Sequence, residues 1–151
     1  MKLYNTLTRK VEDVVPREEG KINMFVCGPT VYDYSHLGHA KTYAQLDVLA
    51  RTLRGAGYET FYLQNITDID DKIIVRANEN NVSWQELRDQ YEAEYHKDME
   101  SLGNTSVSQY ARATDYIADI IPAGAGADGQ RPRLPHRRWH ILRDINLPRI
   151  W

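Results

Sequence analysis

The hydrophobic positions in the first half of the chain predict a strand, a helix and a second strand. An apolar run at residues 22–28, INMFVCG, ends in a glycine and is typical of a buried strand. Residues 58–67, YETFYLQNIT, alternate in polarity and are rich in strand formers. Between them, apolar residues recur every three or four positions, as on one face of a helix: Leu37, Ala40, Ala44, Val48, Leu49 and Leu53. This order predicts two parallel strands joined by a right-handed helical crossover.

Three further helices are expected in the second half. Residues 68–81 begin with three aspartates, whose negative charge favours a helix start. Residues 83–103 open with a capping pattern that pairs Ser83 with Glu86. The apolar stripe of the helix expected over 83–103 consists of Trp84, Leu87, Tyr91, Tyr95, Met99 and Leu102. A last helix is expected from about residue 108 to 121, after which the periodicity is lost.

Charge divides the chain near residue 122. Residues 1–121 hold 13 Lys and Arg against 19 Asp and Glu, a net charge of −6. Residues 122–151 hold six Arg, two Asp and four of the six prolines, a net charge of +4. We therefore expect one domain over 1–121 and a tail over 122–151. A proline-rich tail without an amphipathic period cannot bury enough apolar surface to offset the entropy of ordering, so we expect it to be disordered.

Cysteine usage and hydropathy bear on the compartment. The 151 residues include a single cysteine, Cys27, so no intramolecular disulfide can form, which fits a reducing environment. No apolar run reaches 18 residues, and the first residues lack the apolar core of a secretory signal. The sequence therefore predicts a cytoplasmic protein that does not enter a membrane.

Two histidines mark the start of the first predicted helix. His36, Gly38 and His39 lie where the first strand has ended and the helix begins. A helix N-terminus presents unpaired backbone N–H groups and a partial positive charge, which suit phosphate. Imidazoles at positions i and i+3 share one helical face, so both could donate to phosphate oxygens. The alternative is that the two histidines only cap the helix.

Cys27 follows the first strand at the carboxyl edge of the predicted sheet, where open α/β sheets place their ligands. A lone cysteine is most often a small buried hydrophobe. It could instead be a metal thiolate, but zinc takes four ligands, and Cys27 with His36 and His39 supplies at most three. Partners for a zinc-bound Cys27 would have to come from elsewhere.

The aspartates Asp68, Asp70 and Asp71 allow two interpretations. They could hold magnesium or the amine of a substrate. They could also act only as charges at a helix start, where each stabilises the helix dipole by some tenths of a kcal/mol.

Two motifs in this region resemble those of a known family. HLGH, residues 36–39, is similar to the ATP-binding HIGH signature, and NITDIDDKI, residues 65–73, matches a second family hallmark. Residues 3–121 resemble the amino-terminal catalytic region of cysteinyl-tRNA synthetases, which are class I aminoacyl-tRNA synthetases. The resemblance implies an α/β fold with a Rossmann-type (HUP-like) parallel sheet. It also implies activation of L-cysteine with ATP and transfer to tRNA(Cys).

The family's functional residues carry over by position. The resemblance implies that Cys27 ligates a zinc ion that binds the substrate thiolate, a soft contact that selects cysteine over serine. The residues for the substrate cysteine would be Cys27, Gly28 and Thr30. The residues for ATP would be Pro29, His36, Gly38 and His39. Of these, His36 and His39 would be catalytic, because they would stabilise the charge that develops on the phosphates.

The chain departs from the family pattern after residue 121. There is no second cysteine, no lysine follows Lys97, and the family's KMSKS-like loop and anticodon-binding domain are not found. Residues 127–151 resemble out-of-frame translation, since codons that encode them can spell a family-like continuation from their second base. We therefore expect a truncated fragment that is inactive alone and has an incomplete zinc site. The alternatives are a fragment of a mycothiol-type cysteine ligase, or a non-catalytic nucleotide- or RNA-binding fragment with a basic arm.

Overall fold

The structure is a computed structural model that describes the backbone of residues 1–128 and the side chains of residues 1–122. The chain divides after Ala113 into two units. The first unit contains β1 (Lys2–Asn5), β2 (Lys10–Asp13), β3 (Lys21–Val26), α1 (Leu37–Gly55), β4 (Glu59–Ile66), α2 (Asp71–Asn80), α3 (Trp84–Ser101) and β5 (Gln109–Arg112). A 3-10 turn, η1 (Ala113–Tyr116), and α4 (Ile117–Asp128) follow.

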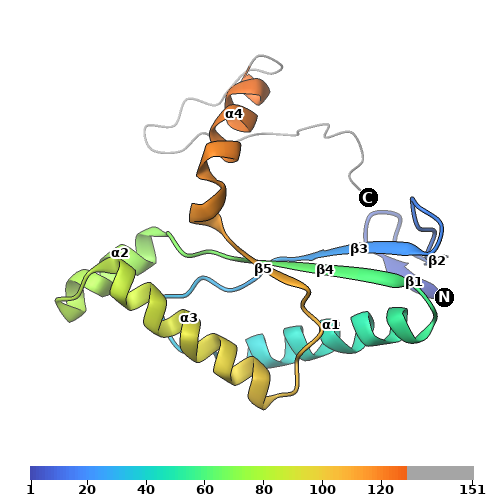
Figure 1. The fold of residues 1–151 in the computed structure, drawn as a ribbon, viewed down its shortest axis with the longest axis horizontal. Helices are drawn as coiled ribbons and strands as arrows, with labels where there is room; N and C mark the ends of the chain where they lie inside the picture. Colours follow the sequence, from blue (N-terminus) through green and yellow to red (C-terminus); the bar gives the residue numbers. More distant parts are fainter. Residues whose placement is uncertain (129–151) are drawn as a thin grey trace. The chain divides into compact units, whose positions relative to one another are not determined.

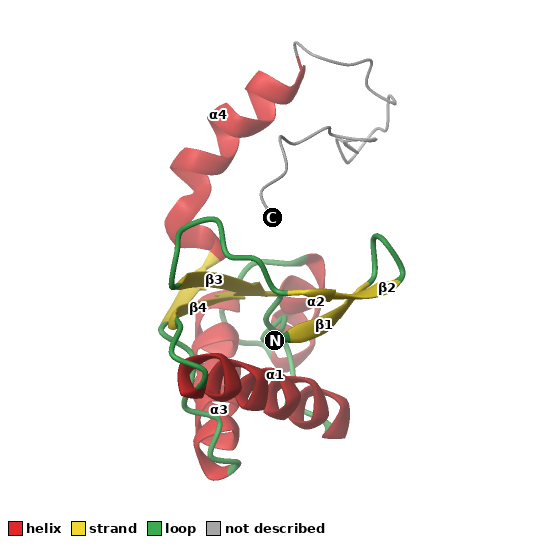
Figure 2. Cartoon of the chain, turned by 90° about the vertical axis from the view of Figure 1, so that its right-hand side faces the viewer, coloured by secondary structure: helices red, strands yellow, loops and turns green. Residues whose placement is uncertain are grey.

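A parallel three-stranded sheet in the order β3-β4-β5 forms the centre of the first unit. Met24 of β3 lies opposite Tyr62 of β4, and Gln64 of β4 lies opposite Tyr110 of β5. Helices α1 and α3 run along the same face of this sheet (Figure 1, Figure 2). The strands β1 and β2 form a separate antiparallel hairpin, which the sequence pattern did not predict. The predicted α/β fold with parallel strands is confirmed.

The core lies between the sheet and these helices. Strand β4 contributes Tyr62, Gln64 and Ile66, all of which are at most 1% exposed. Opposite them pack buried side chains of α1, α2 and α3, namely Tyr43, Ala50, Ile73, Ala77, Leu87, Tyr91, Tyr95 and Met99. The predicted stripe of α3 is thus buried at its four central positions, whereas Leu102 is half exposed. Among the described residues, no helix has both the length and the apolar character needed to cross a bilayer.

The buried face of α1 differs from the predicted one. Leu37 and Val48, two members of the predicted stripe, are 85% and 61% exposed. The buried positions include Asp47, whose carboxylate accepts a hydrogen bond from the Ser106 backbone N–H at 2.7 Å. Burial opposes ionisation of this carboxyl, but hydrogen bonds from Ser106 and Arg51 lower the pKa of Asp47 below its ordinary value. A hydrophobicity pattern cannot predict the burial of Asp47, because this burial depends on hydrogen bonds from Ser106 and Arg51.

The helix expected over 108–121 is wrong in its first half. Residues 109–112 form β5, which pairs with β4, and the helix begins only at Ile117. The strand forms because Ser108 closes onto β4: its backbone N–H donates to the Tyr62 carbonyl at 2.8 Å, and its hydroxyl accepts from the Tyr62 N–H at 3.1 Å. Such a short strand depends on its partner rather than on local propensity.

The helix α4 continues beyond the expected boundary at residue 121. It includes Pro122, which lacks an N–H to donate to the preceding turn, and ends at Asp128. The rest of the predicted tail, residues 129–151, lies outside the described residues. The division into a 1–121 domain and a disordered, out-of-frame tail therefore stays a prediction.

Candidate functional site

The segment after β3 bulges by one residue against β4. Val26 lies opposite Gln64, and Thr30 lies opposite Thr67 in a parallel bridge. Residues 27–29 therefore span the same stretch of sheet as residues 65–66. An extra residue of this kind bends the strand and redirects its side chains, and such bulges are common beside functional sites.

Gly28 is the point at which the bulge meets β4. Its N–H donates to the Asn65 side-chain oxygen at 3.0 Å. A Cβ atom added at Gly28 would lie 1.6 Å from the Asn65 carbonyl oxygen, so no other residue fits without moving the backbone. Pro29 is buried, and its carbonyl accepts from the Thr67 N–H at 2.9 Å. In the structure, Gly28 and Pro29 therefore hold the loop in place.

Cys27 is exposed, contrary to the alternative of a buried hydrophobic cysteine. Its backbone carbonyl accepts a hydrogen bond from the Tyr43 hydroxyl of α1 at 3.4 Å. Burial, aided by the proximity of Cys27, raises the pKa of Tyr43 to about 12, so this hydroxyl stays protonated and can donate at neutral pH. The Cys27 thiol is thus available at the carboxyl end of the parallel sheet.

The two histidines cap α1. The Nδ1 atom of His36 accepts a hydrogen bond from the Gly38 N–H at 3.0 Å, and the Nδ1 atom of His39 accepts one from the His36 N–H at 3.2 Å. Their rings stack with centroids 4.0 Å apart. In a neutral imidazole whose Nδ1 accepts, the proton is assigned to Nε2. The predicted capping role is therefore realised, and it leaves both Nε2–H groups as donors.

The surroundings of His39 favour the neutral form of its imidazole. Burial, together with the neighbouring His36, lowers the pKa of His39 below its ordinary value of 6.5. The His39 ring also lies parallel to the Tyr43 ring, with centroids 6.2 Å apart. Tyr43 thus contacts both His39 and the Cys27 carbonyl, and it brings the two parts of the predicted site together.

Gly38 has a different role from the one expected. A Cβ at this position would lie 2.8 Å from Cε1 and 2.9 Å from Nδ1 of His36. The glycine therefore makes room for the His36 ring to fold back onto the helix end. Its own backbone N–H is engaged by that ring.

The loop between Val31 and the histidines is held by side-chain contacts that the sequence did not predict. Asp33 forms an ion pair with Arg76 of α2. Tyr34 meets Tyr91 of α3 edge-on at 5.2 Å. These partners lie 43 and 57 positions apart in the chain, and no local signal connects them. Their contacts fix the loop that delivers His36 to the start of α1.

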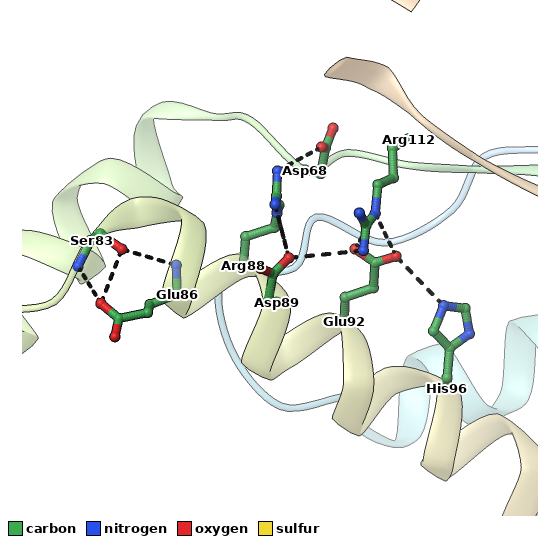
Figure 3. A network of polar contacts seen from close by, with 8 residues as sticks. All are labelled: Asp68, Ser83, Glu86, Arg88, Asp89, Glu92, His96 and Arg112. Atoms are coloured by element: carbon green, nitrogen blue, oxygen red, sulfur yellow. Dashed lines mark hydrogen bonds and ion pairs between the residues drawn. The ribbon is translucent and has the colours of Figure 1, made fainter. Parts of the chain in front are cut away.

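The three aspartates after β4 have different roles. Asp70 caps α2 by accepting from the Lys72 N–H at 2.9 Å, and Asp71 lies in its first turn, as the helix-start interpretation predicts. Asp68 is fully buried and forms an ion pair with Arg88 of α3 at 3.4 Å (Figure 3). Asp68 therefore belongs to a charged network between the sheet and α3, not to the helix start.

The same network reaches β5 (Figure 3). Arg88 also pairs with Asp89, which lies 3.8 Å from Arg112, and Arg112 donates to both carboxylate oxygens of Glu92 at 2.9 Å. Burial opposes ionisation of Glu92, but its contacts with His96 and Arg112 prevail and lower its pKa. The network ties α3 to the carboxyl ends of β4 and β5.

Comparison with known proteins assigns the family. Residues 13–124 match the family model described as "tRNA synthetases class I (C) catalytic domain". The chain belongs to this family. The chain is 54% identical over 121 residues to the cysteine–tRNA ligase of Thermoplasma acidophilum, and 50% identical over the same length to those of Thermoplasma volcanium and Klebsiella pneumoniae. The resemblance inferred from the two motifs is confirmed.

These matches cover 80% of the chain but only 26–27% of the relatives' own length. The chain thus spans about a quarter of the curated relatives that it matches.

The described residues do not make a zinc site by themselves. Within residues 1–122, no three His, Cys, Asp or Glu side chains are grouped so that they could hold a metal ion. The Nδ1 atoms of His36 and His39 already accept backbone hydrogen bonds. Cys27 is the one cysteine of the chain, and a tetrahedral site needs three more ligands.

Proposed function

We propose that this chain supplies the ATP-binding end and part of the cysteine pocket of a cysteine–tRNA ligase. The observation that carries the proposal is the pair of capping imidazoles at the start of α1, whose Nε2–H groups are left as donors. Tyr43 links this helix end to the backbone of the exposed Cys27. The names of the relatives favour this ligase over a mycothiol-type cysteine ligase.

The proposed first step is the formation of cysteinyl adenylate. The carboxylate of L-cysteine attacks the α-phosphorus of ATP, and pyrophosphate leaves with the electron pair of the broken P–O bond. Negative charge shifts onto the phosphate oxygens during this step. The Nε2–H groups of His36 and His39, together with the positive end of α1, would stabilise that charge. Gly38 and Pro29 would contribute by shaping the ATP site around these donors.

The substrate cysteine is assigned to the bulged loop. We propose that Cys27, Gly28 and Thr30 line its pocket, with Gly28 and Thr30 held against β4. If zinc takes part, Cys27 would be one ligand, and the others would lie outside the described residues. The second step, transfer of cysteine to the terminal adenosine of tRNA(Cys), is proposed for the whole enzyme, since this chain matches about a quarter of its relatives.

A single cysteine without a disulfide partner supports a cytoplasmic enzyme. A 151-residue polypeptide is expected to bind ATP weakly and to show no pyrophosphate exchange, because the described residues supply phosphate donors but no complete metal site. An RNA-binding role for the basic arm would rest on residues 122–151, which lie mostly beyond the described part of the chain.

A chimera tests the proposal. The 121 matched residues of the Thermoplasma acidophilum ligase are replaced by those of this chain, and cysteine-dependent exchange of labelled pyrophosphate into ATP is measured. The proposal predicts exchange that depends on cysteine and is lost in the double variant His36→Ala, His39→Ala. A folded chimera without exchange, or with exchange that survives loss of both imidazoles, would refute it.

A further inference from the structure

The peptide group between Cys27 and Gly28 is held from two sides. Its N–H, on Gly28, donates to the Asn65 side chain of β4 at 3.0 Å. Its carbonyl, on Cys27, accepts from the Tyr43 hydroxyl of α1 at 3.4 Å. Both polar groups of this peptide are thus engaged by side chains from two different elements, and the peptide adjoins the exposed Cys27 thiol.

Each of the two side chains is itself immobilised. The Asn65 amide also donates to the Thr67 hydroxyl at 3.3 Å, and the backbone of Asn65 lies directly against Gly28. Tyr43 is 5% exposed, packs edge-on against Tyr95 at 5.6 Å and lies within hydrogen-bonding range of Gln64. Tyr95 in turn accepts a hydrogen bond from Gln64 at 2.6 Å. The two groups that hold the loop are thus anchored in the core.

We infer that Asn65 and Tyr43 are positioning residues, which hold the Cys27–Gly28 peptide between β4 and α1 so that the Cys27 thiol projects from the sheet edge in one orientation. Neither residue has to touch a substrate for this role. The effect on cysteine binding rests on the proposed function, whereas the effect on the loop itself does not. We call the hydrogen bonds of Asn65 and Tyr43 to this peptide the clamp. Because Tyr43 also stacks on His39, the clamp sets the spacing between the Cys27 loop and the imidazoles of His36 and His39.

Amide hydrogen exchange at Gly28, measured by NMR on the 151-residue chain, tests the clamp directly. Asn65→Ala removes the acceptor and should speed exchange at least about tenfold, while Tyr43→Phe removes one hydroxyl and should speed it about threefold. Asn65→Asp keeps an acceptor oxygen and should restore most of the protection. Thr60→Val is the matched control, because it removes a buried hydroxyl of β4 that donates to the Tyr58 carbonyl, away from the loop.

The chimera gives the second readout. In pyrophosphate exchange, Tyr43→Phe should raise the KM for cysteine about fivefold and leave the KM for ATP within about twofold, because the phosphate donors are unchanged. A merely structural defect would lower the amount of active enzyme and hence kcat, with both KM values unchanged.

The outcomes separate the clamp from the proposed function. If Asn65→Ala and Tyr43→Phe match Thr60→Val in Gly28 exchange, the clamp is refuted. If Gly28 exchange responds but the KM for cysteine does not, the clamp is structural and its role in cysteine binding is refuted. If the unmodified chimera lacks cysteine-dependent exchange, the proposed function fails, and the Gly28 measurement still judges the clamp.

Discussion

Helices α1 and α3 begin with the same type of cap, made from different chemistry. In α3, the Ser83 hydroxyl accepts from the Glu86 N–H at 3.1 Å, and the Glu86 carboxylate accepts from the Ser83 N–H at 3.2 Å (Figure 3). In α1, two imidazole Nδ1 atoms do the same work. The carboxylate places a negative charge on the positive end of α3, whereas the neutral imidazoles leave the end of α1 positive.

This difference explains how one helix end can be both capped and open to an anion. A serine and a glutamate use their oxygen atoms on the backbone, and the added charge repels phosphate. An imidazole has a second nitrogen, so His36 and His39 can satisfy the backbone with Nδ1 and still donate through Nε2. We therefore expect α1, and not α3, to bind phosphate.

The largest expected effect comes from removing the donors. In the chimera, His36→Ala with His39→Ala should lower kcat/KM for ATP at least about 100-fold, or ~3 kcal/mol, because two hydrogen bonds to charged oxygens are lost. Ser83→Ala with Glu86→Ala removes the other cap and should leave kcat/KM within about twofold. Equal losses in both double variants would show that the two caps differ only structurally.

A smaller effect is expected from crowding the α1 cap. Gly38→Ala places a Cβ against the His36 ring and should turn the imidazole away, which lowers kcat/KM for ATP about tenfold. Stability should change little, since the lost cap (about 1 kcal/mol) is offset by the higher helix propensity of alanine. Gly55→Ala is the control, because its Cβ would meet nothing within 4 Å. Unchanged kinetics in Gly38→Ala would contradict the assigned ring position.

The two caps should make similar contributions to the free energy of unfolding. Ser83→Ala and His36→Ala are each expected to lower the free energy of unfolding by about 1 kcal/mol, as the loss of an N-cap does. Urea denaturation of the 151-residue chain measures both. A loss for Ser83→Ala alone would mean that the imidazoles do not cap α1.

The smallest expected effect is a pH dependence of the free energy of unfolding that arises from His39 of α1. The folded pKa of His39 lies below 6.5, so its contribution to stability is present above pH 6.5 and is lost as the pH falls through the folded pKa. Because the ring is partly exposed to water, the loss between pH 7.5 and 5.5 should be below about 1 kcal/mol. His39→Gln keeps an acceptor but cannot titrate, so it should show a smaller pH effect than the unmodified chain in urea denaturation. An identical pH dependence in both proteins would contradict this origin.

The sequence predicted what local signals specify. The cap of α3 follows from Ser83 and Glu86, three residues apart, and the parallel strands follow from two apolar runs around a helical period. The histidine pair was placed at the right helix end, with capping and phosphate binding both left open. Here the structure confirms the capping.

What the sequence did not predict depends on distant partners. Strand β5 forms because Ser108 pairs with Tyr62, and the loop before His36 is held by Arg76, 43 residues from Asp33. Asn65 and Tyr43 act on the Cys27–Gly28 peptide only after the bulge has brought them together. Neither residue type nor spacing identifies such contacts in a single sequence.

Exchanging the caps tests the central claim most directly. His36→Ser with His39→Glu gives α1 the cap of α3, and kcat/KM for ATP and the free energy of unfolding are measured in the chimera. If the imidazoles serve both backbone and phosphate, stability should stay within about 1 kcal/mol while kcat/KM falls at least about 100-fold, because the donors are replaced by a carboxylate. A stable variant that keeps kcat/KM within about threefold would contradict the claim.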